Sequence, residues 1–348
     1  MSFFSGINSY VKHICFSACM FFAAGHVLAQ DAVADNMLLF QRNGGGWNKH
    51  LHEKAVDYKK DYSADKSTIE KNKSLDDATI DNEATTKEIK YLVKAYGTTK
   101  NAAYLTAAEN GIRFLLKAQY ENGGWPQYYP DASGYRSQIT FNDNAMVNVL
   151  TVMHDITEGK NGFDVVDKNL VPEAAKAVRK GVECILATQI KVNGELTAWC
   201  AQYNHTTLQP EMARKFELAS ISGSESVGIV RFLMRQPEPS PAIQQAVNAA
   251  IKWFETVKIA GYNFTNQNTN GKKDMVLVPD AASTIWARFY EIGTNKPFFT
   301  GRDSQPKNTV AEIDDERRNG YAWYGAWAAN LLAIEYPRWQ AKLKKGNN

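Results

Sequence analysis

A motif that occurs three times along the chain constrains its fold more than any other feature. Each copy ends a stretch of helical periodicity, continues through a polar turn containing Asn-Gly, and reaches a tryptophan. The three tryptophans are Trp47, Trp125 and Trp199, spaced by 78 and 74 residues. A period of this length holds two helices and their connections. Because repeated helical hairpins stack side by side, the sequence predicts an all-α fold, an (α/α) toroid or barrel.

The same periodicity places candidate helices over most of the chain after residue 83. Loops that follow each hairpin gather on one face of such a fold, and we expect the functional site there. Residues 53–88 are dense in Lys, Asp, Glu, Ser and Thr, which indicates a long solvated excursion that flanks the site. The predicted helices span residues 84–96, 101–119, 144–157, 172–190, 217–235, 240–258, 280–293 and 320–336.

The first 29 residues have the pattern of a targeting segment. Residues 14–25, "ICFSACMFFAAG", are apolar but too few for a membrane-spanning helix. Val27 and Ala29 are small residues placed for a cut after Ala29. The sequence therefore predicts a signal peptide over residues 1–29, a single catalytic domain over residues 30–348, and a secreted or periplasmic protein.

The charges and cysteines narrow the functional classes. The chain has 40 Lys and Arg against 37 Asp and Glu, a net charge of +3, and removing Lys12 with the signal peptide leaves +2. This balance predicts no nucleic-acid partner and no membrane partner, and we expect a monomer. Cys184 and Cys200 either pair in an oxidising compartment or stay as buried thiols. The sequence contains no CxxC, HExxH, GxSxG or P-loop pattern.

Two clusters of Asp and Asn occupy a similar phase of the repeat. Asp81 lies in "TIDNEAT" and Asp143 in "TFNDNAM", 62 residues apart, and a predicted helix follows each. Asp and Asn are preferred helix N-caps, so capping is one interpretation of each cluster. Oxygen ligands of this kind also suit Ca²⁺. The recurrence favours a calcium site with Asp81, Asn82, Asp143 and Asn144 as ligands, and Asn142 or Asp143 is also expected to cap the helix that follows.

Arginines dominate the charged loops of the second half of the chain. Arg214 lies beside an acidic residue, so an ion pair is one explanation for it, and Glu225 suits the first turn of a helix, where the dipole favours acids. Arg288, Arg302 and Arg317 each lie among aromatic residues. Arg binds carboxylates bidentately, and sugar rings stack on aromatic faces. These loops therefore predict a groove for an anionic polysaccharide.

These motifs together resemble the pectate lyases of polysaccharide lyase family 10. The resemblance covers nearly all of residues 35–336. It implies an (α/α) toroid catalytic domain and Ca²⁺-assisted β-elimination on polygalacturonate, which gives 4,5-unsaturated oligogalacturonates. The motifs that carry it are "NGGGW", "TIDNEAT", "FLLKAQYENGGWPQYYP", "TFNDNAM", "LTAWCAQ", "QPEMARKFELASISGSESVG", "FLMRQP", "WARFYE", "FFTGRD" and "ERRNGY".

The resemblance implies roles for individual residues. Asp143 resembles the principal calcium-binding carboxylate, and Asp81 a second aspartate that assists calcium and substrate binding. Arg214 resembles the residue proposed as the base. With the stacking argument above, substrate binding is assigned to Lys49, Trp125, Trp199, Arg288, Arg302 and Arg317.

The implied chemistry needs a base and a source of positive charge. Neutralising the C6 carboxylate of a galacturonate lets negative charge develop at C5, and Ca²⁺ with arginines would supply that neutralisation. Arginine is nearly always protonated in proteins. We expect Ca²⁺ and neighbouring arginines to disfavour the charged form of Arg214, and we predict an alkaline pH optimum.

Two other functions fit parts of the sequence. An inverting glycoside hydrolase on the same toroid would act on an acidic polysaccharide with Asp143 and Glu225 as its acid–base pair. Its products would lack the ultraviolet absorbance of an unsaturated uronate. A non-catalytic uronate-binding protein would use the same arginines and tryptophans, and it would leave the polymer intact.

Overall fold

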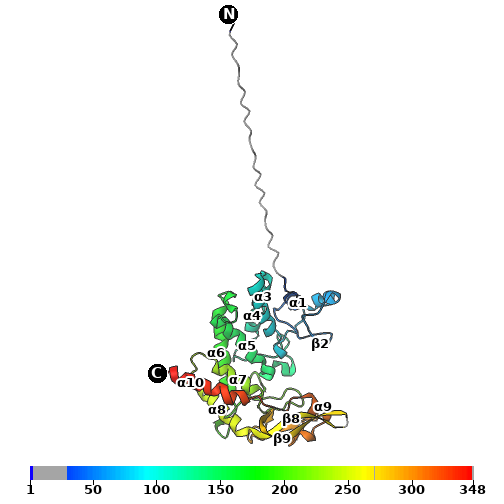
Figure 1. The fold of residues 1–348 in the computed structure, drawn as a ribbon, viewed down its shortest axis with the longest axis vertical. Helices are drawn as coiled ribbons and strands as arrows, with labels where there is room; N and C mark the ends of the chain where they lie inside the picture. Colours follow the sequence, from blue (N-terminus) through cyan, green and yellow to red (C-terminus); the bar gives the residue numbers. More distant parts are fainter. Residues whose placement is uncertain (3–29, 270, 347–348) are drawn as a thin grey trace.

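The computed structural model describes residues 1–2, 30–269 and 271–346. Its α-helices supply most of the regular structure (Figure 1). Most of the predicted signal peptide, residues 3–29, lies outside the described residues. No helix within the described ranges is both long enough and apolar enough to cross a bilayer. The helices are α1 (Ala32–Phe40), α2 (Lys66–Asn72), α3 (Thr86–Thr99), α4 (Ala102–Ala118), α5 (Ala145–Glu158), α6 (Leu170–Thr188), α7 (Glu225–Met234), α8 (Pro241–Val257), α9 (Asp315–Gly320) and α10 (Tyr336–Gly346).

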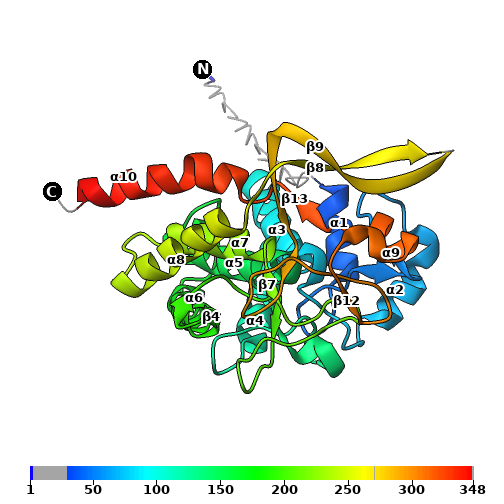
Figure 2. The same ribbon diagram turned by 90° about the horizontal axis from the view of Figure 1, so that it is seen from below.

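Seven of these helices pack in two rows (Figures 1 and 2). In the first row α1, α4, α6 and α8 contact one another in chain order, and in the second row α3, α5 and α7 do the same. Each second-row helix also packs on the first-row helix that follows it in the chain. The predicted hairpin repeat is therefore present, because each repeat contributes one helix to each row.

The recurring tryptophans anchor the loops between the two rows. All three indoles are fully buried, so each N–H needs an acceptor inside the protein. Each indole Nε1 donates a 2.8 Å hydrogen bond to a carbonyl of the first-row helix before it: Trp47 to Met37, Trp125 to Leu115 and Trp199 to Ile185.

A glutamine just after each first-row helix connects consecutive repeats. Its side-chain amide donates to a carbonyl in its own loop and to a second carbonyl in the next first-row helix. The second bonds, 2.8 to 3.0 Å long, join Gln41 to Ala107 in α4, Gln119 to Ala177 in α6 and Gln189 to Ala246 in α8.

The prediction of an all-α toroid is wrong, because the structure also contains antiparallel sheets. β8 has 11 residues and β9 has 16, and β9 lies between β8 and β13 in a three-stranded sheet. The strands are β1 (His50–Leu51), β2 (Lys54–Ala55), β3 (Ile139–Thr140), β4 (Lys191–Val192), β5 (Glu195–Leu196), β6 (Gln202–Tyr203), β7 (Ile221–Ser222), β8 (Ile259–Thr269), β9 (Lys272–Ala287), β10 (Phe289–Tyr290), β11 (Phe299–Thr300), β12 (Pro306–Lys307) and β13 (Tyr324–Gly325).

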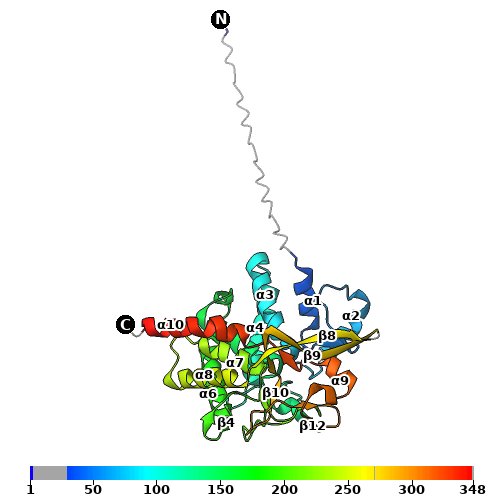
Figure 3. The ribbon, with the colours of Figure 1, turned by 60° about the horizontal axis from the view of Figure 1, so that its bottom comes forward.

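The helix predicted over 280–293 is replaced by strands β9 and β10. A short apolar run does not distinguish helix from strand, and here pairing with β8 decides the outcome. The register joins Ile259 to Ile285 and Thr269 to Lys272. The β8–β9 hairpin projects on the side of α9, away from the end where α10 projects (Figures 2 and 3).

Two further helix predictions need correction. The helix predicted over 217–235 begins only at Glu225, because β7 and a turn precede it. The region predicted as helix over 320–336 contains β13 and then a π-helix, Leu331–Glu335, that leads into α10. Trp323 is fully buried there and donates its indole N–H to the carbonyl of Arg317, which favours a turn over a continuous helix.

The segment predicted as a solvated excursion is partly buried. Tyr58 and Tyr62 pack edge-on against Phe40 of α1, with ring centroids 5.7 and 4.8 Å apart, and Ile69 of α2 is buried. Aromatic residues within a highly charged segment therefore hold it on the first helix. Cys184 and Cys200 are both buried and free, which is the second of the two alternatives that the sequence left open.

Candidate active site

A polar cavity of about 210 Å³ lies where the tryptophan loops meet the second row of helices. It brings together the residues that the sequence assigned to the metal and to the base, with the exception of Asn144. Its lining consists almost wholly of amide, carboxylate, ammonium, guanidinium and phenol groups. The lining residues are Lys49, Asp81, Asn82, Gln127, Tyr135, Asn142, Asp143, Gln202, Arg214 and Glu217.

Consecutive repeats form the same turn at this cavity. The backbone N–H of Thr79 donates to the carbonyl of Trp47 at 2.9 Å, and that of Thr140 donates to Trp125 at 3.2 Å. Three residues further on, Asn82 has φ +49° and Asp143 has φ +51°. This left-handed conformation is one that Asn and Asp adopt more readily than most residues. Sequence and geometry thus agree on why these positions carry short polar side chains.

The structural register corrects the spacing inferred from the sequence. Asn82 and Asp143 are equivalent and lie 61 residues apart, so Asp81 is equivalent to Asn142 rather than to Asp143. The two carboxylates therefore enter the cavity from adjacent positions of the turn. This offset lets both line one small cavity while they come from different repeats.

These turns do not cap the helices that follow them. The N-cap residues of α3 and α5 are Thr85 and Asn144, and neither side chain makes a capping hydrogen bond. The expectation that Asn142 or Asp143 caps α5 is wrong. Instead Asn142 Nδ2 donates to Asp143 Oδ2 at 2.9 Å. The polar side chains are consequently left facing the cavity rather than the helix backbone.

Asn144, predicted as a metal ligand, does not line the cavity. Its Oδ1 lies against Gly228 of α7, where an added Cβ would stand only 2.0 Å from it. The missing side chain of Gly228 therefore makes room for Asn144. Among the Asn residues of the two clusters, Asn82 and Asn142 occupy the cavity instead.

The residue two or three positions after each tryptophan supplies a further polar group. Lys49, Gln127 and Gln202 follow Trp47, Trp125 and Trp199 and all line the cavity. Sequence reasoning missed the two glutamines, although their position after the repeated tryptophan was a usable signal. The ammonium of Lys49 forms an ion pair with the carboxylate of Asp81, which is nearly buried.

Asp143 stands in a field of opposing charges. Partial burial raises its pKa most, and the negative charges of Glu225 and Asp81 raise it further, while Arg288 and Arg214 act in the opposite direction. Glu225 is itself held by Arg288, whose Nη1 donates to Glu225 Oε1 at 2.8 Å. Both side chains of this pair are largely buried. Arg288 is thus fixed beside the cavity by an internal carboxylate.

Arg214 is held in the cavity wall by Glu217. Arg214 Nε donates to Glu217 Oε2 at 2.7 Å and Nη2 donates to Oε1, so the pair is bidentate. The hydrogen bonds and charge of Glu217 raise the pKa of Arg214 above its ordinary value. This overturns the expectation that the surroundings of Arg214 disfavour its charged form. The sequence placed the two residues three positions apart but did not show that both enter the cavity.

Arg302 and Arg317 lie outside the cavity lining but next to Arg214. Their guanidinium carbons and that of Arg214 lie 6.0, 4.6 and 4.8 Å from the ring centroid of Phe216. Arg302 and Arg317 both donate to Glu316, and these bonds lower the pKa of Glu316 to about 2. Phe216 therefore gathers a positively charged surface beside the cavity.

Trp125 and Trp199, predicted to bind substrate, do not reach any surface. Each has 0% of its area exposed, and each indole N–H is used inside the fold. A side chain with no accessible face cannot stack on a sugar ring, so these assignments are wrong. Their role is to position the loops that carry Gln127 and Gln202.

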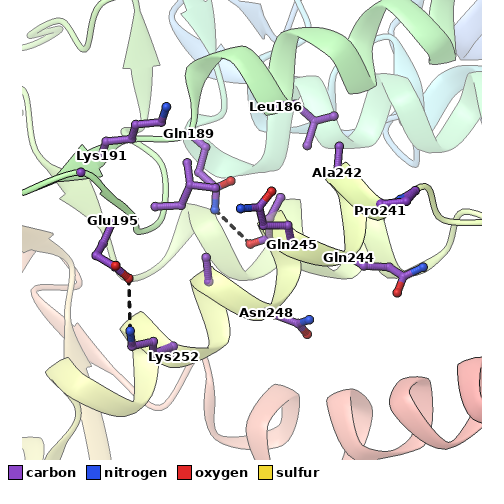
Figure 4. A pocket seen from close by; sticks show the side chains of 14 residues that line it. Leu186, Gln189, Lys191, Glu195, Pro241, Ala242, Gln244, Gln245, Asn248 and Lys252 are labelled. Carbon is purple, nitrogen blue, oxygen red and sulfur yellow. Dashed lines mark hydrogen bonds and ion pairs between the residues drawn. The ribbon is translucent and has the colours of Figure 1, made fainter.

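A larger cavity, of about 840 Å³, lies between the C-terminal end of α6, the β4–β5 hairpin and α8 (Figure 4). Its charged side chains compensate each other, because Lys252 Nζ lies 3.2 Å from Glu195 Oε2. None of the residues that the sequence assigned to catalysis, metal or substrate lines it. Size therefore does not indicate where the chemistry lies in this molecule.

Comparisons with known proteins agree with the smaller, polar site as the reactive one. A sequence model of the pectic acid lyase family matches residues 41–332. The structure of a family 10 polysaccharide lyase from Cellvibrio cellulosa is similar, with 36% identity, a TM-score of 0.76, and coverage of 88% of this chain and 91% of that chain. A mutant of the Cellvibrio cellulosa enzyme in complex with trigalacturonic acid has the same identity and TM-score, with coverage of 88% and 92%. A search of curated proteins finds no match.

The fold and site are therefore those of a polysaccharide lyase. Residues 41–332 span most of the chain, and the chain belongs to the pectic acid lyase family. This confirms the family that the sequence motifs resembled, and with it a pectate lyase activity. A glycoside hydrolase and a non-catalytic uronate-binding protein do not fit this family.

Proposed function

We propose that the cavity around Asp81, Asp143 and Arg214 cleaves polygalacturonate by calcium-dependent β-elimination. The observation that carries the proposal is the convergence of two carboxylates from consecutive repeats with one guanidinium in a single polar cavity. The similar enzyme from Cellvibrio cellulosa was solved with trigalacturonic acid, which supports polygalacturonate as the polymer. The positive surface around Phe216 is complementary to the charge of such a chain.

The donor set of the cavity fits calcium. Asp81, Asp143, Asn82, Asn142 and Gln202 offer carboxylate and amide oxygens, which are the ligands that Ca²⁺ prefers. The raised pKa of Asp143 shows that negative charge is concentrated beyond what the local cations neutralise. Within the described residues no group of three or more His, Cys, Asp or Glu side chains could hold a metal by itself. We therefore propose that Asp143 and Asp81 hold the ion and that substrate and water complete its shell.

Lys49 competes with calcium for Asp81 in this proposal. Its ammonium already pairs with the Asp81 carboxylate. We propose that a substrate carboxylate draws Lys49 away from Asp81, so that Lys49 binds the polymer while Asp81 becomes free for the ion. Calcium and substrate would then bind cooperatively, because each removes a partner that the other must displace.

When bound, Ca²⁺ supplies the positive charge that makes the C5 proton of the neighbouring uronate more acidic. We propose that Arg214, in its neutral form, accepts that proton. The C5–H electron pair forms the C4=C5 double bond, the C4–O bond breaks, and the departing oxygen takes a proton from solvent. Arg288, Arg302 and Arg317 are proposed to bind uronate carboxylates, with Arg288 the most rigid of the three because Glu225 holds it.

The base assignment sets the pH dependence. Because Glu217 raises the pKa of Arg214, the neutral form becomes more abundant only as pH rises, so activity should increase towards alkaline pH. An Arg214→Lys variant should keep substrate binding and lose most turnover. Near-wild-type kcat in that variant would refute Arg214 as the base.

The decisive experiment is incubation with polygalacturonate at alkaline pH, with Ca²⁺ or with EGTA, followed by the ultraviolet absorbance of unsaturated uronate. Absorbance that rises only with Ca²⁺ is expected. Chain shortening without this absorbance would indicate hydrolysis, and cleavage in EGTA would refute the calcium dependence. We further propose, from the sequence, that the enzyme is monomeric and acts outside the cytoplasm, which size-exclusion chromatography and cell fractionation would test.

A further inference from the structure

We propose that Glu217 is a positioning residue for the reaction, which sets both the direction and the protonation of Arg214. This inference rests on the proposed function of Arg214 as the base. It goes beyond that assignment because it names the group on which the base depends. The carboxylate of Glu217 reaches Arg214 from within the same loop and lies almost buried, with 8% of its side chain exposed, whereas Arg214 is 46% exposed.

The contacts of Glu217 fix Arg214 from two sides. Besides the bidentate side-chain pair, the backbone N–H of Arg214 donates to Glu217 Oε2 at 3.2 Å. The backbone N–H of Glu217 in turn donates to the carbonyl of Arg214 at 2.7 Å. A guanidinium bound through both of these routes has few accessible rotamers. One edge of Arg214 is occupied, and the remaining nitrogen faces the cavity opening.

Glu217 is itself held by a different part of the chain. The hydroxyl of Tyr321 donates to Glu217 Oε1 at 3.0 Å, and the Tyr321 ring packs edge-on against Phe216, with centroids 5.3 Å apart. The guanidinium of Arg288 lies 4.8 Å from the centroid of the same Tyr321 ring. Tyr321 therefore links the loop of Arg214 to the Arg288–Glu225 pair on the other side of the site.

The charge of Glu217 also decides when Arg214 can lose its proton. Glu217 is the strongest influence that raises the pKa of Arg214, and Tyr321 and Tyr135 act in the same direction. Arg302, which shares Phe216 with Arg214, lies close enough for the two positive charges to repel. An amide in place of the carboxylate keeps a similar shape but removes the negative charge.

The chain offers a matched control for this arrangement. Arg231 and Glu335 form the same bidentate pair, with Nε and Nη2 both 2.8 Å from the carboxylate oxygens, but they lie on α7 and the π-helix outside the cavity. A Glu335→Gln variant therefore removes an Arg–Glu pair of equal geometry without touching the proposed base.

The test is the pH dependence of kcat and KM on polygalacturonate with Ca²⁺ for the wild type and for Glu217→Gln, Glu217→Asp, Tyr321→Phe and Glu335→Gln. We expect Glu217→Gln to lower kcat about 100-fold at fixed pH, with a smaller effect on KM, because a base displaced by about 1 Å loses activity on this scale. Its alkaline rise should also shift to lower pH. Glu217→Asp should restore the wild-type position of that rise, and Glu335→Gln should match the wild type in both respects.

Wild-type kcat and an unshifted pH profile in folded Glu217→Gln would overturn the inference. If that variant does not fold, Tyr321→Phe decides, since it must lower kcat by loosening Glu217, and wild-type kcat there would also overturn it. A wild type that releases no unsaturated uronate would refute the proposed function together with this inference. A wild type that does so while Glu217→Gln is unaffected refutes only the inference.

Discussion

Arg288 Nη1 donates to Glu225 Oε1 at 2.8 Å, and the two side chains are only 11% and 2% exposed. Breaking one side of a buried pair leaves the other charge without compensation. We predict that Arg288→Ala lowers the free energy of unfolding by about 3–5 kcal/mol, as measured by urea denaturation. Arg288→Ala with Glu225→Gln together should recover part of this loss, and a double variant as unstable as the single one would contradict the explanation.

Gly228 is expected to be intolerant of even the smallest side chain. In an ordinary helix Gly→Ala stabilises by roughly 0.5–1 kcal/mol. At position 228 the new Cβ would stand 2.0 Å from Asn144 Oδ1, and Asn144 adjoins Asp143. We therefore predict that Gly228→Ala weakens calcium binding, measured by isothermal titration, and lowers kcat. Gly97→Ala is the control, because no atom lies within 4 Å of its added Cβ.

Asp143 gives a prediction with opposite effects on stability and activity. Its pKa is raised in the folded protein, so its contribution to stability is fully present below the ordinary aspartate pKa and is lost as pH rises through the folded pKa. Asp143→Asn should therefore stabilise the calcium-free protein at neutral pH and have little effect in acid. The same variant should lose calcium-dependent activity. Unfolding curves at the two pH values and the absorbance assay measure these effects, and intact activity would contradict a metal-binding role.

Glu88 predicts a loss of stability in the alkaline range where the enzyme is expected to work. This residue of α3 is fully buried, and neither carboxylate oxygen has a hydrogen-bond partner in the described structure. Burial raises its pKa to about 7, so stability should fall as pH rises through that value. Glu88→Gln should be more stable than the wild type above pH 7 by on the order of 3 kcal/mol, and equal to it below the ordinary glutamate pKa. Equal urea midpoints at alkaline pH would refute this.

Much of the helical framework was predictable from the sequence because the repeat marks it at several levels. The tryptophan motif predicted the hairpins, and the structure shows the reason, since each indole bonds to the helix before it. The β8–β9 hairpin was not predictable in the same way. Its strands pair over long range, and the apolar residues around Ile285 fit a helix locally.

The site was predictable in its residue types more than in its arrangement. Asp81, Asp143 and Arg214 do line one cavity, as their motifs suggested. The one-residue offset between the two acidic turns depends on backbone φ values that no spacing count reveals. Trp125 and Trp199 were misassigned because an aromatic residue in a loop motif looks the same in sequence whether it binds sugar or fills the core.

The glutamines that end the first-row helices make the order of assembly part of the fold. Gln41, Gln119 and Gln189 each find their second acceptor only in a helix that the chain has not yet supplied when their own repeat is complete. A chain that stops between repeats keeps an amide at its growing edge that has no partner from the next hairpin. Each hairpin thus prepares the surface on which the next one docks, so the helical rows are extended from one end like a templated polymer.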